Sequence, residues 1–119
     1  MVYCLSRKNY QTVAIKNDGT LWAWGYNYFG QLGDGTTDNK NIPTQESTAS
    51  TTWLTVSVAG YHAVAIKNDG TLWSWGDNGY GQLGNGIMGN NSIPTQEATA
   101  NNDWDTISAG GVSYNIYQK

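Results

Sequence analysis

The sequence contains one long stretch twice, almost unchanged. Val13–Gly25 (VAIKNDGTLWAWG) returns as Val64–Gly76 (VAIKNDGTLWSWG), with twelve of thirteen letters identical and an offset of 51 residues (64 − 13). The same offset relates the GQLG segments at 30–33 and 81–84, and also the two IPTQE segments, without any gap. Repetition at about 50 residues is typical of solenoids, propellers and arrays. The repeat therefore narrows the architecture before any local pattern is considered.

The composition favours strands over helices. The 119 residues include 6 Trp and 8 Tyr but 1 Phe, together with 15 Gly and only 13% charged residues. Amphipathic aromatic side chains suit half-buried strands, and glycine suits tight turns. We therefore expect an all-β protein small enough to form one domain.

Charge and cysteine content argue against several classes of protein. The net charge of −3, without a basic stripe, predicts no nucleic-acid or anionic-membrane partner. No apolar run reaches the ~18–20 residues that span a membrane, and the N-terminus lacks a signal-peptide pattern, so we expect a cytoplasmic protein by default. Cys4 is the only cysteine, which excludes an intramolecular disulfide and predicts a small buried residue.

Each repeat predicts four strands. Alternating apolar residues mark the strands, Asn-Asp-Gly marks a hairpin turn, and a proline in the last strand suits an outer edge. The expected strands of the first unit are Val2–Ser6, Gln11–Lys16, Thr20–Gly25 and Ile42–Glu46. Those of the second unit are Trp53–Ala59, His62–Lys67, Thr71–Gly76 and Ile93–Glu97. A further pair is expected at Trp104–Ala109 and Ser113–Gln118.

Four-stranded antiparallel units at this period are typical of β-propeller blades. We expect one propeller-like domain over residues 1–119, with blade 1 at about 1–51, blade 2 at about 52–102 and a partial third unit at 103–119. Two and a half blades leave unpaired strands and apolar faces. We therefore expect a partial propeller that is completed by oligomerisation, most simply as a trimer of about six blades, or by a longer parent propeller. In a ring of copies the extra strand pair must swap or cap.

The repeats resemble the regulator of chromosome condensation repeat family. The shared marks are Ala59-Gly60-x-His62 before a strand, then DGTLWxWG, then NxxGQLG at 27–33 and 78–84. The resemblance spans nearly the whole chain and implies propeller blades, with the first strand lining the channel and the fourth outside, in rings of seven blades. The chain departs from the pattern at Gln11 and Ser113, which stand where the second unit has His62.

Paired tryptophans lie two residues apart on the third strand of each unit, at positions 22 and 24 and at positions 73 and 75. Residues two apart on a strand share a face. We expect these pairs to pack between neighbouring blades, because large aromatic side chains dominate core energetics. The alternative is a stacking platform for a sugar or a peptide.

The glycine-rich segments GQLGDG at 30–35 and GQLGNG at 81–86 resemble phosphate-binding loops in composition. A phosphate loop needs a following helix that supplies converging N–H groups, whereas here a proline-containing strand follows. We expect these loops to pack tightly through Leu32 and Leu83, with glycines at positive φ.

Catalytic and metal-binding constellations are not evident. Asp34, Asp38 and Asn39 share one loop, but the matching loop of the second unit has no carboxylate, so a calcium site is not expected. His62 is the only histidine, which argues against a triad or a zinc site, and we expect its ring to bond to backbone. The two Asp-Gly aspartates are expected to be turn residues. The sequence predicts no cofactor and no enzyme activity.

The leading functional hypothesis is a non-catalytic protein-interaction module, because repeat scaffolds present loops on one rim for binding. The alternatives are lectin-like carbohydrate binding, a purely structural role, and guanine-nucleotide exchange, an activity of the family that it resembles. Exchange is disfavoured because nothing here matches the acidic loop face it would need. The candidate ligand-binding residues are Tyr26, Tyr28, Trp53, Asn78, Tyr80 and Trp104, with Trp53 and Trp104 expected to be exposed near a rim.

Overall fold

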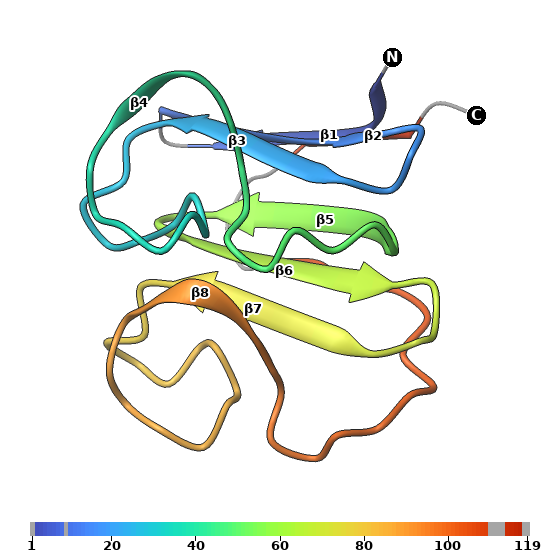
Figure 1. Cartoon of the computed structure of the whole chain (residues 1–119). Helices are drawn as coiled ribbons and strands as arrows, with labels where there is room; N and C mark the ends of the chain where they lie inside the picture. The colour runs from blue at the N-terminus through green and yellow to red at the C-terminus, as the bar shows by residue number, and fades with distance from the viewer. Residues whose placement is uncertain (1, 9, 110–113, 118–119) are drawn as a thin grey trace.

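The computed structural model describes residues 2–8, 10–109 and 114–117, and within these ranges the chain forms nine β-strands. They make two antiparallel sheets that lie one above the other in Figure 1. The first sheet has the order β4-β3-β2-β1-β9, and the second has the order β5-β6-β7-β8. The strands are β1 (Val2–Lys8), β2 (Gln11–Lys16), β3 (Leu21–Gly25), β4 (Lys40–Gln45), β5 (Trp53–Ala59), β6 (His62–Lys67), β7 (Leu72–Gly76), β8 (Asn91–Gln96) and β9 (Tyr114–Tyr117).

The first eight strands form two meanders of four, which confirms the all-β architecture of antiparallel propeller blades. The pairing register repeats as well, since Gln11 pairs with Gly25 in blade 1 and His62 pairs with Gly76 in blade 2. The third strand of each blade begins one residue later than predicted. In blade 1 Thr20 instead bonds to Asp18 of the turn through its N–H and its hydroxyl.

The hydrophobic core lies between the two blades. Trp75 is fully buried there, and its indole Nε1 donates across the interface to the carbonyl oxygen of Gln31 at 2.9 Å. The prediction of inter-blade packing is therefore confirmed for Trp75, whereas its repeat counterpart Trp24 is half-buried because no described blade precedes blade 1. The core cluster comprises Val13, Ile15, Leu21, Ala23, Leu32, Trp53, Val56, Val58, Ala63, Ala65 and Trp75.

The GQLG loops pack as predicted. Leu32 and Leu83 are buried, and Gly30 and Gly33 have φ angles of 78° and 73°, a conformation that suits glycine. The segments that follow are irregular and lead into β4 and β8, so no helix N-terminus faces either loop. Gly30 and Gly33 serve tight packing between the blades, because an added Cβ would lie 2.7 Å from Ser92 Cα and 2.8 Å from Trp75 Nε1, respectively.

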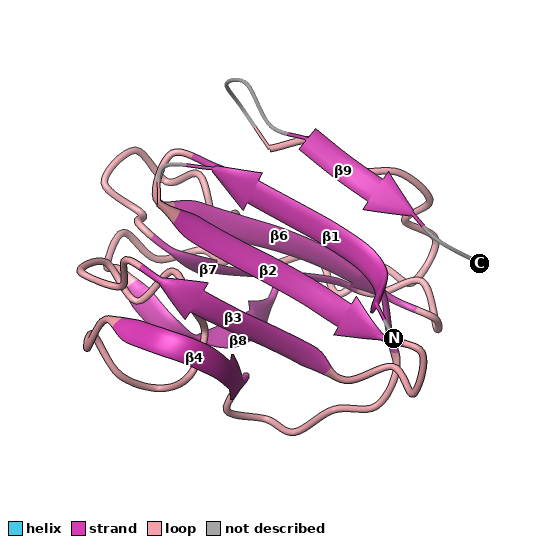
Figure 2. Ribbon diagram, turned by 90° about the horizontal axis from the view of Figure 1, so that it is seen from above, coloured by secondary structure: helices cyan, strands magenta, loops and turns pink. Residues whose placement is uncertain are grey.

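The third unit differs from the prediction. Residues 104–109 form no strand, and β9 pairs antiparallel with β1 of blade 1, as Figure 2 shows. An isolated strand has no partner for its N–H and C=O groups, whereas the free edge of β1 supplies one. The surplus segment thus covers an edge of its own chain. The prediction for Cys4 falls on a side chain outside the described residues.

Candidate binding surface

One rim of the two blades carries the β1–β2 and β5–β6 hairpin turns. The chain leaving β3 lies beside the first turn, because the Tyr26 N–H donates to the Tyr10 carbonyl oxygen at 3.0 Å. In blade 2 the Asp77 N–H donates in the same way to the Tyr61 carbonyl oxygen at 2.9 Å. Each blade therefore presents a hairpin turn and a long loop side by side on this rim.

Four aromatic rings from both blades meet on this rim, and we call Tyr26, Tyr28, Phe29 and Tyr61 the aromatic cluster. Tyr26 and Tyr28 stack with ring centroids 6.4 Å apart, and Phe29 meets Tyr28 edge-on at 5.1 Å. Tyr61 of blade 2 lies 4.9 Å from Phe29 and 5.8 Å from Tyr26. Tyr28 is nevertheless 67% exposed. The cluster both joins the blades and offers an aromatic surface to solvent.

The sequence pointed to Tyr26 and Tyr28 but missed the other two members of the cluster. The repeat itself contains the pattern that could have identified them. The counterpart of Phe29 at the offset of 51 is Tyr80, and the counterpart of Tyr61 is Tyr10. Aromatic residues thus recur at both positions, although a single blade does not show that they meet.

Asn27 holds the loop that carries the cluster. Its buried Nδ2 donates to the carbonyl oxygens of Thr36 (3.0 Å) and Asp38 (2.9 Å), while its Oδ1 accepts from the Leu32 N–H (2.9 Å). Its backbone N–H donates to Asn39 Oδ1 at 2.8 Å. These bonds cross-link the loop from inside, so the aromatic rings are presented on a preorganised backbone.

In blade 2 the structure separates two of the predicted site residues. Asn78 is fully buried, and its amide group donates to the carbonyl oxygens of Ile87 (2.7 Å) and Gly89 (3.0 Å). Its Oδ1 accepts from the Leu83 N–H at 3.0 Å, so this amide is used within the loop. Tyr80, on the same loop, is 93% exposed. Tyr80 can meet a partner, whereas Asn78 shapes the loop.

The two tryptophans expected near a rim also differ. Trp53 is only 3% exposed, which corrects the expectation of exposure: its ring packs 5.8 Å from that of Trp75, and its Nε1 donates to Glu46 Oε2 at 3.3 Å. Trp104 is 38% exposed, as expected. Its backbone N–H donates to the Gly70 carbonyl oxygen, at the rim opposite the aromatic cluster.

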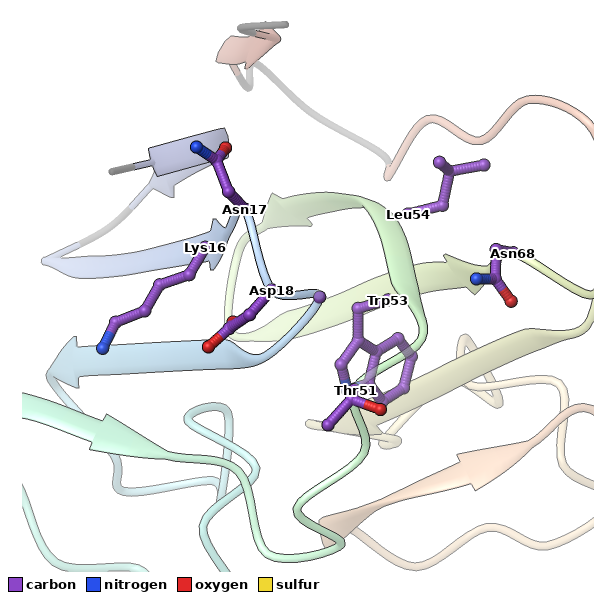
Figure 3. A pocket seen from close by; sticks show the side chains of 8 residues that line it. Lys16, Asn17, Asp18, Thr51, Trp53, Leu54 and Asn68 are labelled. Atoms are coloured by element: carbon purple, nitrogen blue, oxygen red, sulfur yellow. The ribbon is translucent and has the colours of Figure 1, made fainter.

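A shallow pocket of about 230 Å³ lies on that opposite rim, shown in Figure 3. The β2–β3 turn (residues 16–19) forms one side, and the segment 51–54 with Asn68 forms the other. Asp18, at the centre of the turn, accepts from both the N–H and the hydroxyl of Thr20, which holds the pKa of its carboxyl below the ordinary range. This confirms Asp18 as a turn residue.

His62 begins β6 beside the aromatic rim. Burial lowers the pKa of its imidazole from the ordinary 6.5, against smaller opposing effects of the Asp77 carboxylate and of a hydrogen bond with the Ala59 backbone. That the ring bonds to backbone stays a prediction, which this effect of the Ala59 backbone supports. Gln11 occupies the same register in blade 1.

We expect the lowered pKa of His62 to make stability pH-dependent. The unfolded chain binds a proton near pH 6.5 that the folded chain does not, so the free energy of unfolding should fall as the pH drops below about 6.5. His62→Gln, which copies blade 1, should flatten the slope between about pH 7 and pH 5. Urea denaturation at several pH values measures this, and an unchanged slope in His62→Gln would assign it to other groups.

Among the described residues, no group of three His, Cys, Asp or Glu side chains could hold a metal ion. The same part of the chain contains no helix of the length and apolar character needed to cross a membrane.

A known repeat family matches the repeated segments of this chain. The family model described as the regulator of chromosome condensation (RCC1) repeat matches residues 18–66 and 69–112, and a second model of this repeat matches residues 55–82. The chain belongs to the RCC1 repeat family. The RCC1 resemblance of the sequence is thereby confirmed, and the matched ranges contain all four strands of blade 2 and the last two strands of blade 1.

Two curated RCC1-type relatives come from Arabidopsis thaliana. The chain is 36% identical to the mitochondrial RCC1 domain-containing protein RUG3, covering 86% of this chain and 23% of the relative. It is 31% identical to the ultraviolet-B receptor UVR8, covering 83% and 23%. A solved structure of yeast RCC1 (Prp20) bound to Kap60 superposes with a TM-score of 0.72 at 17% identity, covering 81% of this chain and 24% of that one. The chain thus spans about a quarter of the length of these RCC1 proteins.

Proposed function

We propose that this chain is a non-catalytic RCC1-type module that binds a protein partner through the aromatic cluster. The observation that carries the proposal is the stacked Tyr26–Tyr28 pair, in which Tyr28 stays 67% exposed above a loop cross-linked by Asn27. Tyrosine is enriched at binding hot spots because it offers a large, rigid face with a polar tip. A preorganised loop lowers the entropic cost of binding.

Structural relatives give this proposal a precedent. One structural neighbour is described by its binding properties to Gsp1p and histones, and another is yeast RCC1 bound to Kap60. These interactions belong to those proteins, and the match covers only 25% and 24% of their chains. They support protein binding as a use of RCC1 propellers and leave the partner of this chain to experiment.

A random peptide library displayed on phage tests the proposal. We expect the immobilised chain to enrich peptides whose affinity falls about tenfold or more in Tyr28→Ala, because a hot-spot tyrosine contributes over ~1.4 kcal/mol. The matched control is Ile42→Ser, which removes a side chain of similar exposure (66%) on the outer strand β4. Failure to enrich peptides, or equal loss in both variants, would contradict the aromatic cluster as the site.

Carbohydrate binding is a second candidate, favoured by the same stacked tyrosine pair, since sugars pack on flat aromatic faces. A glycan array decides between the two. Glycan binding that disappears in Tyr28→Ala, with no enriched peptide, would replace the protein-binding proposal by the lectin one. No glycan binding would remove the lectin candidate.

A further inference from the structure

Two sets of groups, one from each blade, form the interface between the blades. The repeat places a second copy of each set on the outward faces of the two-blade unit. Blade 1 offers a set of groups toward blade 2, and the repeat places the same set on blade 2, facing away from blade 1. Blade 2 in turn offers a receiving set, which recurs on blade 1. We propose that the outward face of blade 2 binds the receiving face of blade 1 from a second copy of this chain.

The first contact in this interface is the GQLG loop against a tryptophan. Inside the chain the Trp75 Nε1 donates to the Gln31 carbonyl oxygen, and a Cβ added to Gly33 would lie 2.8 Å from this nitrogen. The counterparts are Trp24, which is half-buried, and Gly84, which has nothing within 4 Å of an added Cβ. Among the described residues the Trp24 indole has no hydrogen bond. A second copy would bring these groups together.

The second contact is aromatic. Phe29 of blade 1 packs 4.9 Å from Tyr61 of blade 2. Their counterparts, Tyr80 and Tyr10, are 93% and 89% exposed. They lie on opposite ends of the two-blade unit, so they can meet only between copies. Their pairing would bury the two most exposed of the large apolar and aromatic side chains in the described part of the chain.

The third contact is a backbone bond in the outer part of the interface. The Gly35 N–H donates to the Ser92 carbonyl oxygen at 2.9 Å, joining the loop of blade 1 to β8 of blade 2. At the offset of 51 the partners are the Gly86 N–H of one copy and the Asn41 carbonyl oxygen of the next. Three kinds of contact thus point to one rigid-body relation, the one already present between the blades.

Residues 104–109 stand in the way of part of this docking. They run along β5, with the Ala109 N–H donating to Ser57 Oγ at 3.1 Å, where β1 of an incoming copy would lie. They form no strand and most of them are exposed, whereas β1 is paired on both sides. Residues 104–109 are therefore the segment that an incoming copy displaces. The free energy needed to displace them weakens the association. We expect binding that rises with concentration into the range of about 0.1–1 mM.

Sedimentation velocity over a concentration series tests the proposal. We expect the wild-type mass to rise with concentration and Gly84→Ala to associate about tenfold more weakly, because its added methyl group would meet Trp24 of the second copy. Gly60→Ala is the matched control: it also substitutes a glycine at positive φ (58° against 64° at Gly84), nothing lies within 4 Å of its added Cβ, and it belongs to none of the three contacts.

Trp24→Phe provides a second arm in case Gly84→Ala folds poorly. It keeps an aromatic ring but removes the indole N–H, and it should also weaken association. A wild-type chain that stays monomeric up to about 1 mM would overturn the proposal, as would association in Gly84→Ala and Trp24→Phe equal to that of the control. Tyr28 lies outside the GQLG, tyrosine-pair and backbone contacts, so its effect on peptide binding is scored separately.

Discussion

Trp75→Ala is expected to lower the free energy of unfolding by about 3–5 kcal/mol, the range for large aromatic residues removed from a core. Trp75 is fully buried between the blades, and its loss also leaves the buried Gln31 carbonyl oxygen without its indole donor. A small domain has a total stability of only about 5–15 kcal/mol, so this variant should be near its unfolding limit. Urea denaturation followed by tryptophan fluorescence and circular dichroism measures the loss.

The repeat supplies the matched control for this prediction. Trp24→Ala removes the same side chain from the same strand position, where it is half-buried and no described blade covers it. Measured at a concentration where the chain is monomeric, Trp24→Ala should cost about 1 kcal/mol, the centre of the range for single substitutions. Equal losses at the two positions would show that the blades do not pack through Trp75.

Gly19→Ala is expected to destabilise the chain by about 2–5 kcal/mol, combining a left-handed backbone penalty with a backbone clash. Gly19 has a φ of 84°, and an added Cβ would lie 1.9 Å from the carbonyl oxygen of Thr51. The same turn receives the Trp53 N–H at the Gly19 carbonyl oxygen (3.1 Å), so relieving the clash disturbs the entry of the chain into blade 2. Thermal or urea denaturation measures the change.

Gly60→Ala separates the two causes. Gly60 also has a positive φ, 58°, but nothing lies within 4 Å of its added Cβ. It should therefore lose only the backbone penalty, about 1–2 kcal/mol. A loss in Gly19→Ala no larger than this would mean that the Thr51 approach relaxes without cost and does not fix the geometry between blades.

The repeat predicted the strands well because each depends on local pattern and on its immediate neighbours. It failed at residues 104–109, where strand formation depends on a partner that the chain supplies elsewhere. The local sequence there resembles that of β5, which begins at Trp53. β5 pairs with the six-residue strand β6, whereas the segment that should pair with 104–109 lies on β1 instead. A local sequence pattern does not determine which distant segments pair.

Exposure was the other quantity that local sequence could not supply. Trp53 and Trp104 occupy the same repeat position, yet Trp53 is 3% and Trp104 is 38% exposed. The difference comes from Trp73 and Trp75, whose rings flank Trp53, whereas the described residues include no such pair of tryptophans beside Trp104. Tyr61 was missed as a member of the aromatic cluster for the same reason, because it joins the cluster from the other blade.

Hydrogen exchange of the tryptophan indole N–H groups, read by nitrogen-resolved NMR, tests most directly that the chain is two adjacent propeller blades. At a concentration where the chain is monomeric, the Trp75 indole N–H should be protected nearly to the level of global unfolding, because it is buried and bonded to the Gln31 carbonyl oxygen. The Trp24 indole N–H should exchange rapidly. Fast exchange at Trp75, or equal protection at the two sites in the monomer, would contradict the account.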